Sequence, residues 1–181
     1  MRVRVNSKYI PKMKKEKCFK GAVIFDMDGV ISDTQKFHAE AESVVLAKCG
    51  INLEPHKITA KYAGITDEEM FTDLFQQFKI QTAADVPIKE KWDIMKNIAI
   101  GNISAIPGAI SLIELLKTTG FKLGIASSSP LNFIEFVISE LKIKEKFDAI
   151  TSAEEVEQGK PHPSIFILAA QKLDTSPKEC I

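Results

Sequence analysis

Short apolar runs recur along this chain and alternate with segments of helical periodicity. The first run, residues 22–25, leads straight into two acidic residues and is typical of a strand buried on both faces of a parallel sheet. Further runs predict strands at residues 122–126 and 147–151, and residues 179–181 look like the opening of another. Strands that alternate with helices in this way predict an α/β fold built on a parallel sheet.

Helical patterns fill the segments between these strands. No strand pattern interrupts residues 34–104, so this segment is predicted to be a helical insertion. Thr66 followed by Glu69 is a capping-box signal for the start of its second helix. The predicted helices cover residues 35–49, 66–78, 88–99, 109–118, 132–141 and 164–172. The apolar stripe of the first helix is predicted to consist of Phe37, Ala41, Val44, Val45 and Ala47.

Bulk composition points to an ordinary globular protein. The chain has 181 residues, of which 45% are hydrophobic, enough for one sizeable core or for a core with a small second domain. We find no apolar run of membrane-spanning length and no secretory leader pattern, so no membrane association is expected. Cys18, Cys49 and Cys180 are too scattered for a disulfide framework or a metal site, which favours a reducing, cytoplasmic location.

The net charge of zero hides a strongly basic N-terminal arm. Residues 1–20 hold eight of the 24 basic residues and one of the 24 acidic residues, which gives the arm +7 and the rest of the chain −7. Such an arm can bind nucleic acid or anionic lipid. Because it has no interleaved aromatic residues, the favoured interpretation is a solvated or disordered leader, and nucleic acid is not an expected partner.

Polar side chains follow each of the predicted strands. Asp26 and Asp28 follow the first, Ser127 and Ser129 end the second, and Lys160 follows the third. The carboxyl ends of parallel strands share one edge of a sheet, where ligands bind, so these groups are expected to converge. Two neighbouring carboxylates raise each other's pKa, and a divalent cation commonly offsets their repulsion. Taken singly, the same residues also suit an Asp-Gly turn, serine caps and a solvated Lys-Pro loop.

Two acids, a hydroxyl and an ammonium together suit a phosphoryl group. One carboxylate can attack phosphorus and form an aspartyl-phosphate, and the other can pass a proton to the leaving oxygen and later take one from water. A lysine and a metal ion can neutralise the equatorial oxygens of the transferring group.

Three motifs in this order resemble the haloacid dehalogenase-like hydrolase superfamily and, within it, the β-phosphoglucomutase-like phosphatases. The motifs lie at residues 25–34 (FDMDGVISDT), 125–129 (IASSS) and 159–163 (GKPHP). The resemblance covers residues 21–181. It implies a Rossmann-like core, formed by residues 21–33 and 105–181, and an inserted α-helical cap domain at residues 34–104, with residues 1–20 as the arm.

The resemblance also implies a role for individual residues. Asp26 is expected to be the nucleophile and a Mg²⁺ ligand. Asp28 is expected to be the general acid/base, with its backbone carbonyl also binding Mg²⁺. Ser127 and Lys160 are expected to bind the transferring phosphoryl group. Residues expected to contact or support the substrate are Thr34, His38, Thr66, Ser128 and Ser129.

Two departures from the family pattern affect the expected activity. Asp67 stands where the mutases have an arginine that grips a second phosphate. An acid there repels phosphate, so hydrolysis of a small phosphorylated metabolite, a sugar phosphate above all, is favoured over phosphomutase activity. Family members also carry an acidic pair that completes the Mg²⁺ site after the strand that begins here at residues 179–181, and the sequence stops at Ile181 before such a pair.

The missing pair leaves two further hypotheses open. The chain is either a fragment of an active phosphatase or a natural short form that binds phosphorylated ligands with weak or no catalysis. Either way, an incomplete sheet predicts an open edge, through which a monomer can form a weak oligomer. Glu154, Glu155 and Glu157 are interpreted as solvated loop acids rather than replacement ligands.

Overall fold

The computed structural model describes residues 21–181, and the basic arm of residues 1–20 lies outside the described part. Its sheet contains β1 (Ala22–Phe25), β2 (Lys122–Ser127) and β3 (Ala149–Ser152), all parallel and in the order β1-β2-β3. Ala22 pairs with Lys122, and Gly124 pairs with Ala149. The predicted parallel sheet is therefore confirmed, although β3 begins two residues later than the pattern indicated.

The last residues of the chain lie along the free side of β1. Ile181 donates its N–H to the carbonyl of Ala22 at 3.0 Å, and its own carbonyl accepts from Ile24 at 2.9 Å. Cys180 forms an isolated parallel bridge with Ala22. Pairing next to β1 thus begins at Cys180, whereas Glu179 still belongs to a short 3-10 turn, η4 (Pro177–Glu179).

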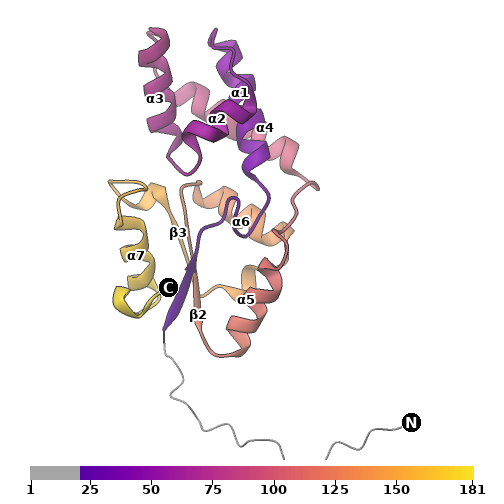
Figure 1. Cartoon of the computed structure of the whole chain (residues 1–181), viewed down its shortest axis with the longest axis vertical. Coiled ribbons are helices and arrows are strands. Elements are labelled where there is room, and N and C mark those ends of the chain that lie inside the picture. Colours follow the sequence, from indigo (N-terminus) through magenta and orange to yellow (C-terminus); the bar gives the residue numbers. More distant parts are fainter. Residues whose placement is uncertain (1–20) are drawn as a thin grey trace, which may run out of the picture.

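Helices cover both faces of the sheet (Figure 1). One face packs on α5 (Ala109–Thr118) and α6 (Leu131–Glu140), with Phe25, Leu123 and Ile125 in the shared apolar cluster. The other face packs on α7 (Ser164–Lys172) through a smaller cluster that includes Ala126, Ile165 and Ala169. Successive strand residues therefore point to opposite faces, and both faces are buried, as the continuous apolar runs predicted. Two further 3-10 turns are η2 (Lys144–Lys146) and η3 (Ala153–Glu155).

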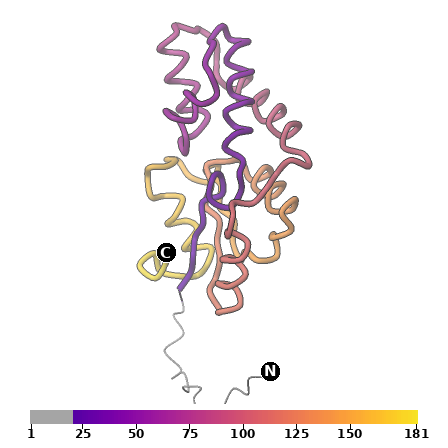
Figure 2. The backbone as a smooth tube through the Cα atoms, turned by 45° about the vertical axis from the view of Figure 1, so that its right-hand side comes forward, coloured from indigo at the N-terminus to yellow at the C-terminus, as the bar shows by residue number. Residues whose placement is uncertain are grey.

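Four helices are inserted between β1 and α5 and lie beyond the carboxyl ends of the strands (Figures 1 and 2). They are α1 (Gln35–Lys48), α2 (Pro55–Tyr62), α3 (Asp67–Phe78) and α4 (Asp85–Ala99). Their outer parts share a second apolar cluster around Leu46, Phe71 and Leu74. The α/β fold with inserted helices is confirmed, while the domain limits stay a prediction.

Sequence patterns were least accurate within the insertion. The eight-residue helix α2 was not predicted, because two turns are too short for a clear apolar period. Helix α4 begins at Asp85, three residues before the predicted start. In α1 the stripe prediction was wrong for Val44 and Ala47, which are exposed, because the buried positions follow a spacing of four through Phe37 and Ala41.

Within residues 21–181, none of the helices combines the length and the apolar character that crossing a membrane requires.

Candidate active site

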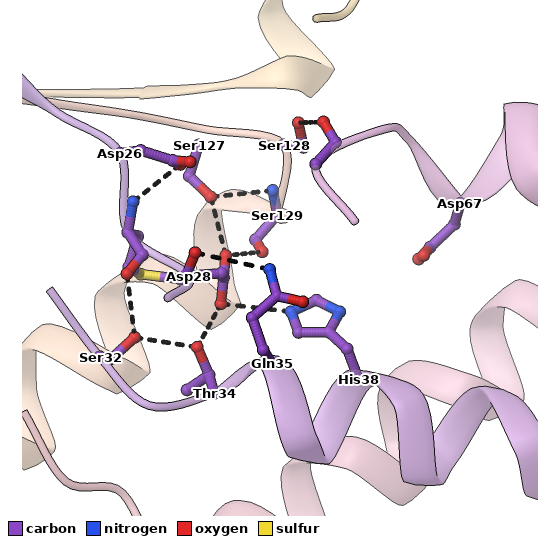
Figure 3. Close-up of polar contacts among 12 residues, drawn as sticks. Asp26, Asp28, Ser32, Thr34, Gln35, His38, Asp67, Ser127, Ser128 and Ser129 are labelled. Atoms are coloured by element: carbon purple, nitrogen blue, oxygen red, sulfur yellow. Dashed lines mark hydrogen bonds and ion pairs between the residues drawn. The ribbon is translucent and has the colours of Figure 1, made fainter. Parts of the chain in front are cut away.

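A tight loop after β1 places two carboxylates at the sheet edge. The carbonyl of Met27 accepts hydrogen bonds from the N–H groups of Ile31 and Ser32 at 2.9 and 3.0 Å, which folds the chain back on itself. Gly29 has a φ of +80°, a left-handed conformation that favours glycine. Met27 is fully buried, so its side chain anchors the loop in the core. Asp26 and Asp28, on either side of Met27, extend into the space between the sheet and the inserted helices (Figure 3).

Asp28 is held by polar groups from three segments of the chain (Figure 3). Its Oδ2 accepts hydrogen bonds from Ser129 Oγ at 2.8 Å and from Ser127 Oγ at 3.2 Å. Its Oδ1 accepts from the Thr34 hydroxyl and lies 3.2 Å from His38 Nε2. Burial alone raises the pKa of Asp28, but the charge and hydrogen bond of His38, together with the hydrogen bonds from Thr34 and Ser129, outweigh it. The net result is a pKa well below the usual range.

Asp26 is the more open of the two carboxylates, with 37% of its side chain exposed against 11% for Asp28. Its Oδ1 accepts from its neighbour, the Met27 N–H, at 2.8 Å and lies 2.8 Å from Lys160 Nζ. Lys160 also donates to the carbonyl of Ala126, at the end of β2, at 3.0 Å. The lysine is therefore fixed between two strand ends and faces the open carboxylate.

The remaining predicted site residues take different positions around the two carboxylates. Ser127 and Thr34 are fully buried, and their hydroxyls contact Asp28. Ser128 reaches from the sheet edge to the insertion, where its hydroxyl donates to the Gly64 carbonyl at 3.2 Å. Thr66 caps α3 by accepting from the Glu69 N–H at 3.3 Å, which confirms the predicted capping box.

A small inner cavity of about 50 Å³ joins these groups. From the sheet side it is lined by Asp26, Asp28, Ser128, Ser129 and Lys160. From the insertion it is lined by residues of α1, α2 and α4, and by the segment that leads into α3. Asp67, at the start of α3, faces the Asp28 network across it (Figure 3). The structure thus brings the predicted residues together at the carboxyl edge of the sheet, where α/β folds bind ligands.

One charged residue of the site, Lys91, was not predicted from the sequence. Lys91 of α4 is fully buried, and its ammonium lies 2.7 Å from Asp67 Oδ1, 3.0 Å from His38 Nδ1 and 3.4 Å from Glu42 Oε1. It also lies 3.9 Å from the centre of the Trp92 ring. A signal was present in the sequence, because Lys91 occupies a buried stripe of α4 whose neighbours four residues away are Pro87 and Met95.

His38, Glu42 and Asp67 place one ligand atom each within 4.8 Å of one another, a spacing that also suits a metal ion. The Lys91 ammonium already lies within 3.4 Å of all three side chains. A divalent ion at the same point is strongly repelled by this positive charge. We therefore interpret the group as an ion cluster held together by a lysine, not as a metal site.

Oxygen atoms near Asp26 fit a hard divalent cation better. Within the described residues, the contacts of the Asp26 carboxylate are both made by Oδ1. The nearby Asp28 carbonyl receives a contact of 3.5 Å from Gln35 Nε2. Mg²⁺ is commonly bound by one or two such protein oxygens together with water and substrate phosphate. These two residues therefore fit a Mg²⁺ site that a bound phosphate completes.

The family follows from the sequence as a whole. The sequence model of the haloacid dehalogenase-like hydrolases matches residues 23–181. The chain belongs to the haloacid dehalogenase-like hydrolase family. The resemblance seen in the three motifs is therefore confirmed, and with it the expectation of an enzyme.

Relatives within the family include phosphatases and mutases. Hexitol phosphatase B of Escherichia coli is 29% identical over 167 residues, which cover 88% of this chain and 72% of that protein. The β-phosphoglucomutase of Bacillus subtilis is 31% identical over 166 residues, with the same two coverages. The crystal structure of a β-phosphoglucomutase from Clostridium difficile superposes with a TM-score of 0.80 at 30% identity, covering 89% of this chain and 74% of that one.

Proposed function

We propose that this protein is a Mg²⁺-dependent phosphatase that hydrolyses small phosphorylated metabolites, sugar phosphates above all, through an aspartyl-phosphate. The contrast between Asp26 and Asp28 carries the proposal. One carboxylate is the more exposed and faces Lys160, as a nucleophile requires, and the other is mostly buried and oriented by four side chains, as a proton-transfer group requires. Relatives named as a hexitol phosphatase and a phosphorylated carbohydrates phosphatase support the substrate class.

In the first step, an oxygen of Asp26 attacks phosphorus and the bond from phosphorus to the leaving oxygen breaks. Asp28 gives a proton to that oxygen, so the product leaves as an alcohol. The low pKa of Asp28 in the free protein favours its carboxylate form. A phosphate dianion that enters the inner cavity raises the pKa of Asp28 by like-charge repulsion, and this brings the proton to the carboxyl when substrate is bound.

In the second step, water attacks the phosphorus of the aspartyl-phosphate. Asp28, now a carboxylate, takes a proton from that water, the bond between Asp26 and phosphorus breaks, and inorganic phosphate leaves. Lys160 lies 2.8 Å from Asp26, close enough to neutralise phosphoryl oxygens in both steps. Asp26 and the Asp28 carbonyl would hold Mg²⁺, which when bound would add charge neutralisation at the same oxygens.

Hydrolysis is favoured over the mutase reaction by the charge of the insertion. A mutase must also bind a second phosphate, and the inner cavity presents Asp67 and Glu42 on the insertion side. Phosphomutase activity is the alternative for this protein, because one of its relatives is named β-phosphoglucomutase. The free thiols of Cys49 and Cys180 are consistent with the proposed cytoplasmic location.

Asp26→Asn tests the proposal directly. With Mg²⁺ present, we expect the unchanged chain to hydrolyse para-nitrophenyl phosphate and the variant to lose roughly a thousandfold in kcat, because the amide cannot attack phosphorus. Asp33→Asn is the matched control, since Asp33 is a half-exposed carboxylate of the same segment and pairs with Lys36. Equal rates for Asp26→Asn and Asp33→Asn, with both variants folded, would refute Asp26 as the nucleophile.

A further inference from the structure

A second and much larger hollow adjoins the inner cavity. This outer cleft has a volume of about 870 Å³ and lies between the start of α3 and the segment at residues 153–163. Asp67, Trp92 and Ser128 line both the inner cavity and the outer cleft. A phosphoryl group placed against Asp26 therefore directs the rest of its substrate toward the outer cleft.

The acidic side chains that line the outer cleft give it a negative charge. They come from both of its walls and comprise Asp67, Glu68, Glu69, Glu154 and Glu157. Two of them are tied in place, because Glu69 accepts from the Thr66 N–H at 3.4 Å and Glu154 accepts from the Leu131 N–H at 2.9 Å. Among the described residues that line the outer cleft there is no lysine or arginine, and His162 is the lone basic side chain.

The nearest cation of the insertion cannot serve a substrate. The Lys91 ammonium is already engaged, because it lies 2.7 Å from Asp67 Oδ1, 3.4 Å from Glu42 Oε1 and 3.0 Å from His38 Nδ1. Its side chain is fully buried. Lys160, the cation of the sheet edge, is engaged beside Asp26, at the end of the site that takes the phosphoryl group. The leaving group therefore meets negative charge without a free positive partner.

We infer that the site selects phosphomonoesters whose leaving group is a neutral polyol and rejects those with a second phosphate or carboxylate, with Asp67 as the specificity-determining residue. This inference rests on the proposed phosphatase function. Hydroxyl groups donate hydrogen bonds to carboxylates, so a polyol suits the lining of the outer cleft. A second anion in the same place is repelled by the carboxylates at short range. Asp67 acts twice, because its own charge repels an anion and its contact with Lys91 withholds the cation.

Sorbitol 6-phosphate and 6-phosphogluconate form a matched pair of probes. They share six carbons and the position of the phosphate, and differ at carbon 1, which is a hydroxymethyl group in one and a carboxylate in the other. We expect the Asp26→Asn chain to bind the first at least about tenfold more tightly by calorimetry. The wild-type chain should show a similar preference in kcat/KM, and both preferences should shrink as salt is added.

Asp67→Asn should reduce the preference to about threefold or less, because it removes a repelling charge and frees a donor of Lys91. Glu68 is exposed in the outer cleft and has no contact with Lys91 among the described interactions. Glu68→Gln should therefore reduce the preference for sorbitol 6-phosphate in part, and it replaces Asp67→Asn as the test if that variant does not fold. Asp93→Asn is the control, since Asp93 is exposed on α4 and lines neither hollow.

The outcomes separate the inference from the proposed function. If Asp26→Asn binds the two probes equally and the wild type hydrolyses them equally, the selectivity is overturned and the proposed phosphatase function is retained. A binding preference without hydrolysis of either probe supports the selectivity and removes the phosphatase. A preference that neither Asp67→Asn nor Glu68→Gln alters overturns the assignment to the cleft carboxylates.

Discussion

The sheet edge and the helical insertion each hold a charge that is mostly or fully buried, but they stabilise it in different ways. At the sheet edge, the Asp28 carboxylate is surrounded by donors, three of which are hydroxyl groups. In the insertion, the Lys91 ammonium lies between two carboxylates. His38 contacts both charges, through Nε2 and Nδ1. The hydroxyl donors stabilise the negative charge of Asp28 without cancelling it, whereas the single positive charge of Lys91 is outnumbered by the two carboxylates that pair with it.

This difference is consistent with separate roles for the two regions. The sheet edge presents a carboxylate that can exchange protons, while the insertion presents a neutralised cation and leaves acidic groups facing the outer cleft. Chemistry is therefore expected to depend on the sheet edge, and substrate choice on the insertion.

The largest effect on stability is expected from Lys91→Met. Methionine retains much of the packing but removes the ammonium that the buried Glu42 and the partly buried Asp67 share. Breaking a buried ion pair by removing one partner costs about 3–5 kcal/mol of unfolding free energy. Urea unfolding measures the loss, and the double variant Glu42→Gln with Lys91→Met should recover part of it.

Lys48→Met is the control for that experiment. Lys48 pairs with Glu90 at the surface, with 55% of the lysine side chain exposed. An exposed pair of this kind contributes about 0–1 kcal/mol. If Lys91→Met destabilises the protein no more than Lys48→Met, then the buried cluster does not stabilise the insertion as we describe.

The same comparison explains what the sequence could predict. Asp26, Asp28, Ser127 and Ser129 directly follow or end strands, and parallel strands bring such positions to one edge whatever the details of packing. Helices α5 and α7 were also predicted at both ends, because each has a clear apolar period and short flanking loops. Local signals were sufficient where one element determines where a side chain lies.

The ion cluster of Lys91, His38, Glu42 and Asp67 could not be predicted in this way. Its members come from α1, α3 and α4, and lie up to 53 positions apart in the sequence. Periodicity shows which face of each helix is apolar but not how three helices are oriented toward one another. For the same reason the sequence indicated Asp67 only as an acid that repels phosphate, and its contact with Lys91 is seen only in the packed insertion.

The pH dependence of the unfolding free energy should differ between the wild type and the variant Asp28→Asn. The pKa of Asp28 is lower in the folded protein than in the unfolded chain, so the unfolded chain binds more protons in acid. The stabilisation from Asp28 is therefore complete above its unfolded pKa, near neutral pH, and is lost as the pH falls toward the folded pKa.

Asp28→Asn removes this contribution, so its unfolding free energy should fall less steeply than that of the wild type between pH 6 and pH 3. Urea unfolding at a series of pH values checks this. Parallel slopes for the two proteins would show that the hydroxyl groups and His38 do not favour the carboxylate form of Asp28.

The smallest effect is expected from Thr66→Ala, at the point where α3 positions Asp67 against Lys91. The Thr66 hydroxyl accepts from the Glu69 N–H, and the Glu69 carboxylate accepts from the Thr66 N–H. Loss of such a cap costs about 1 kcal/mol. Thr72→Ala, on the exposed side of the same helix, should change stability by less than about 0.5 kcal/mol, since alanine is the better helix former.

Chemical denaturation of both variants measures the difference. Because the cap orients the first turn of α3, Thr66→Ala should also weaken the preference for sorbitol 6-phosphate over 6-phosphogluconate, while Thr72→Ala should not. A loss of stability without any change in that preference would mean that Asp67 is held by Lys91 alone, and that the start of the helix contributes only to the stability of the insertion.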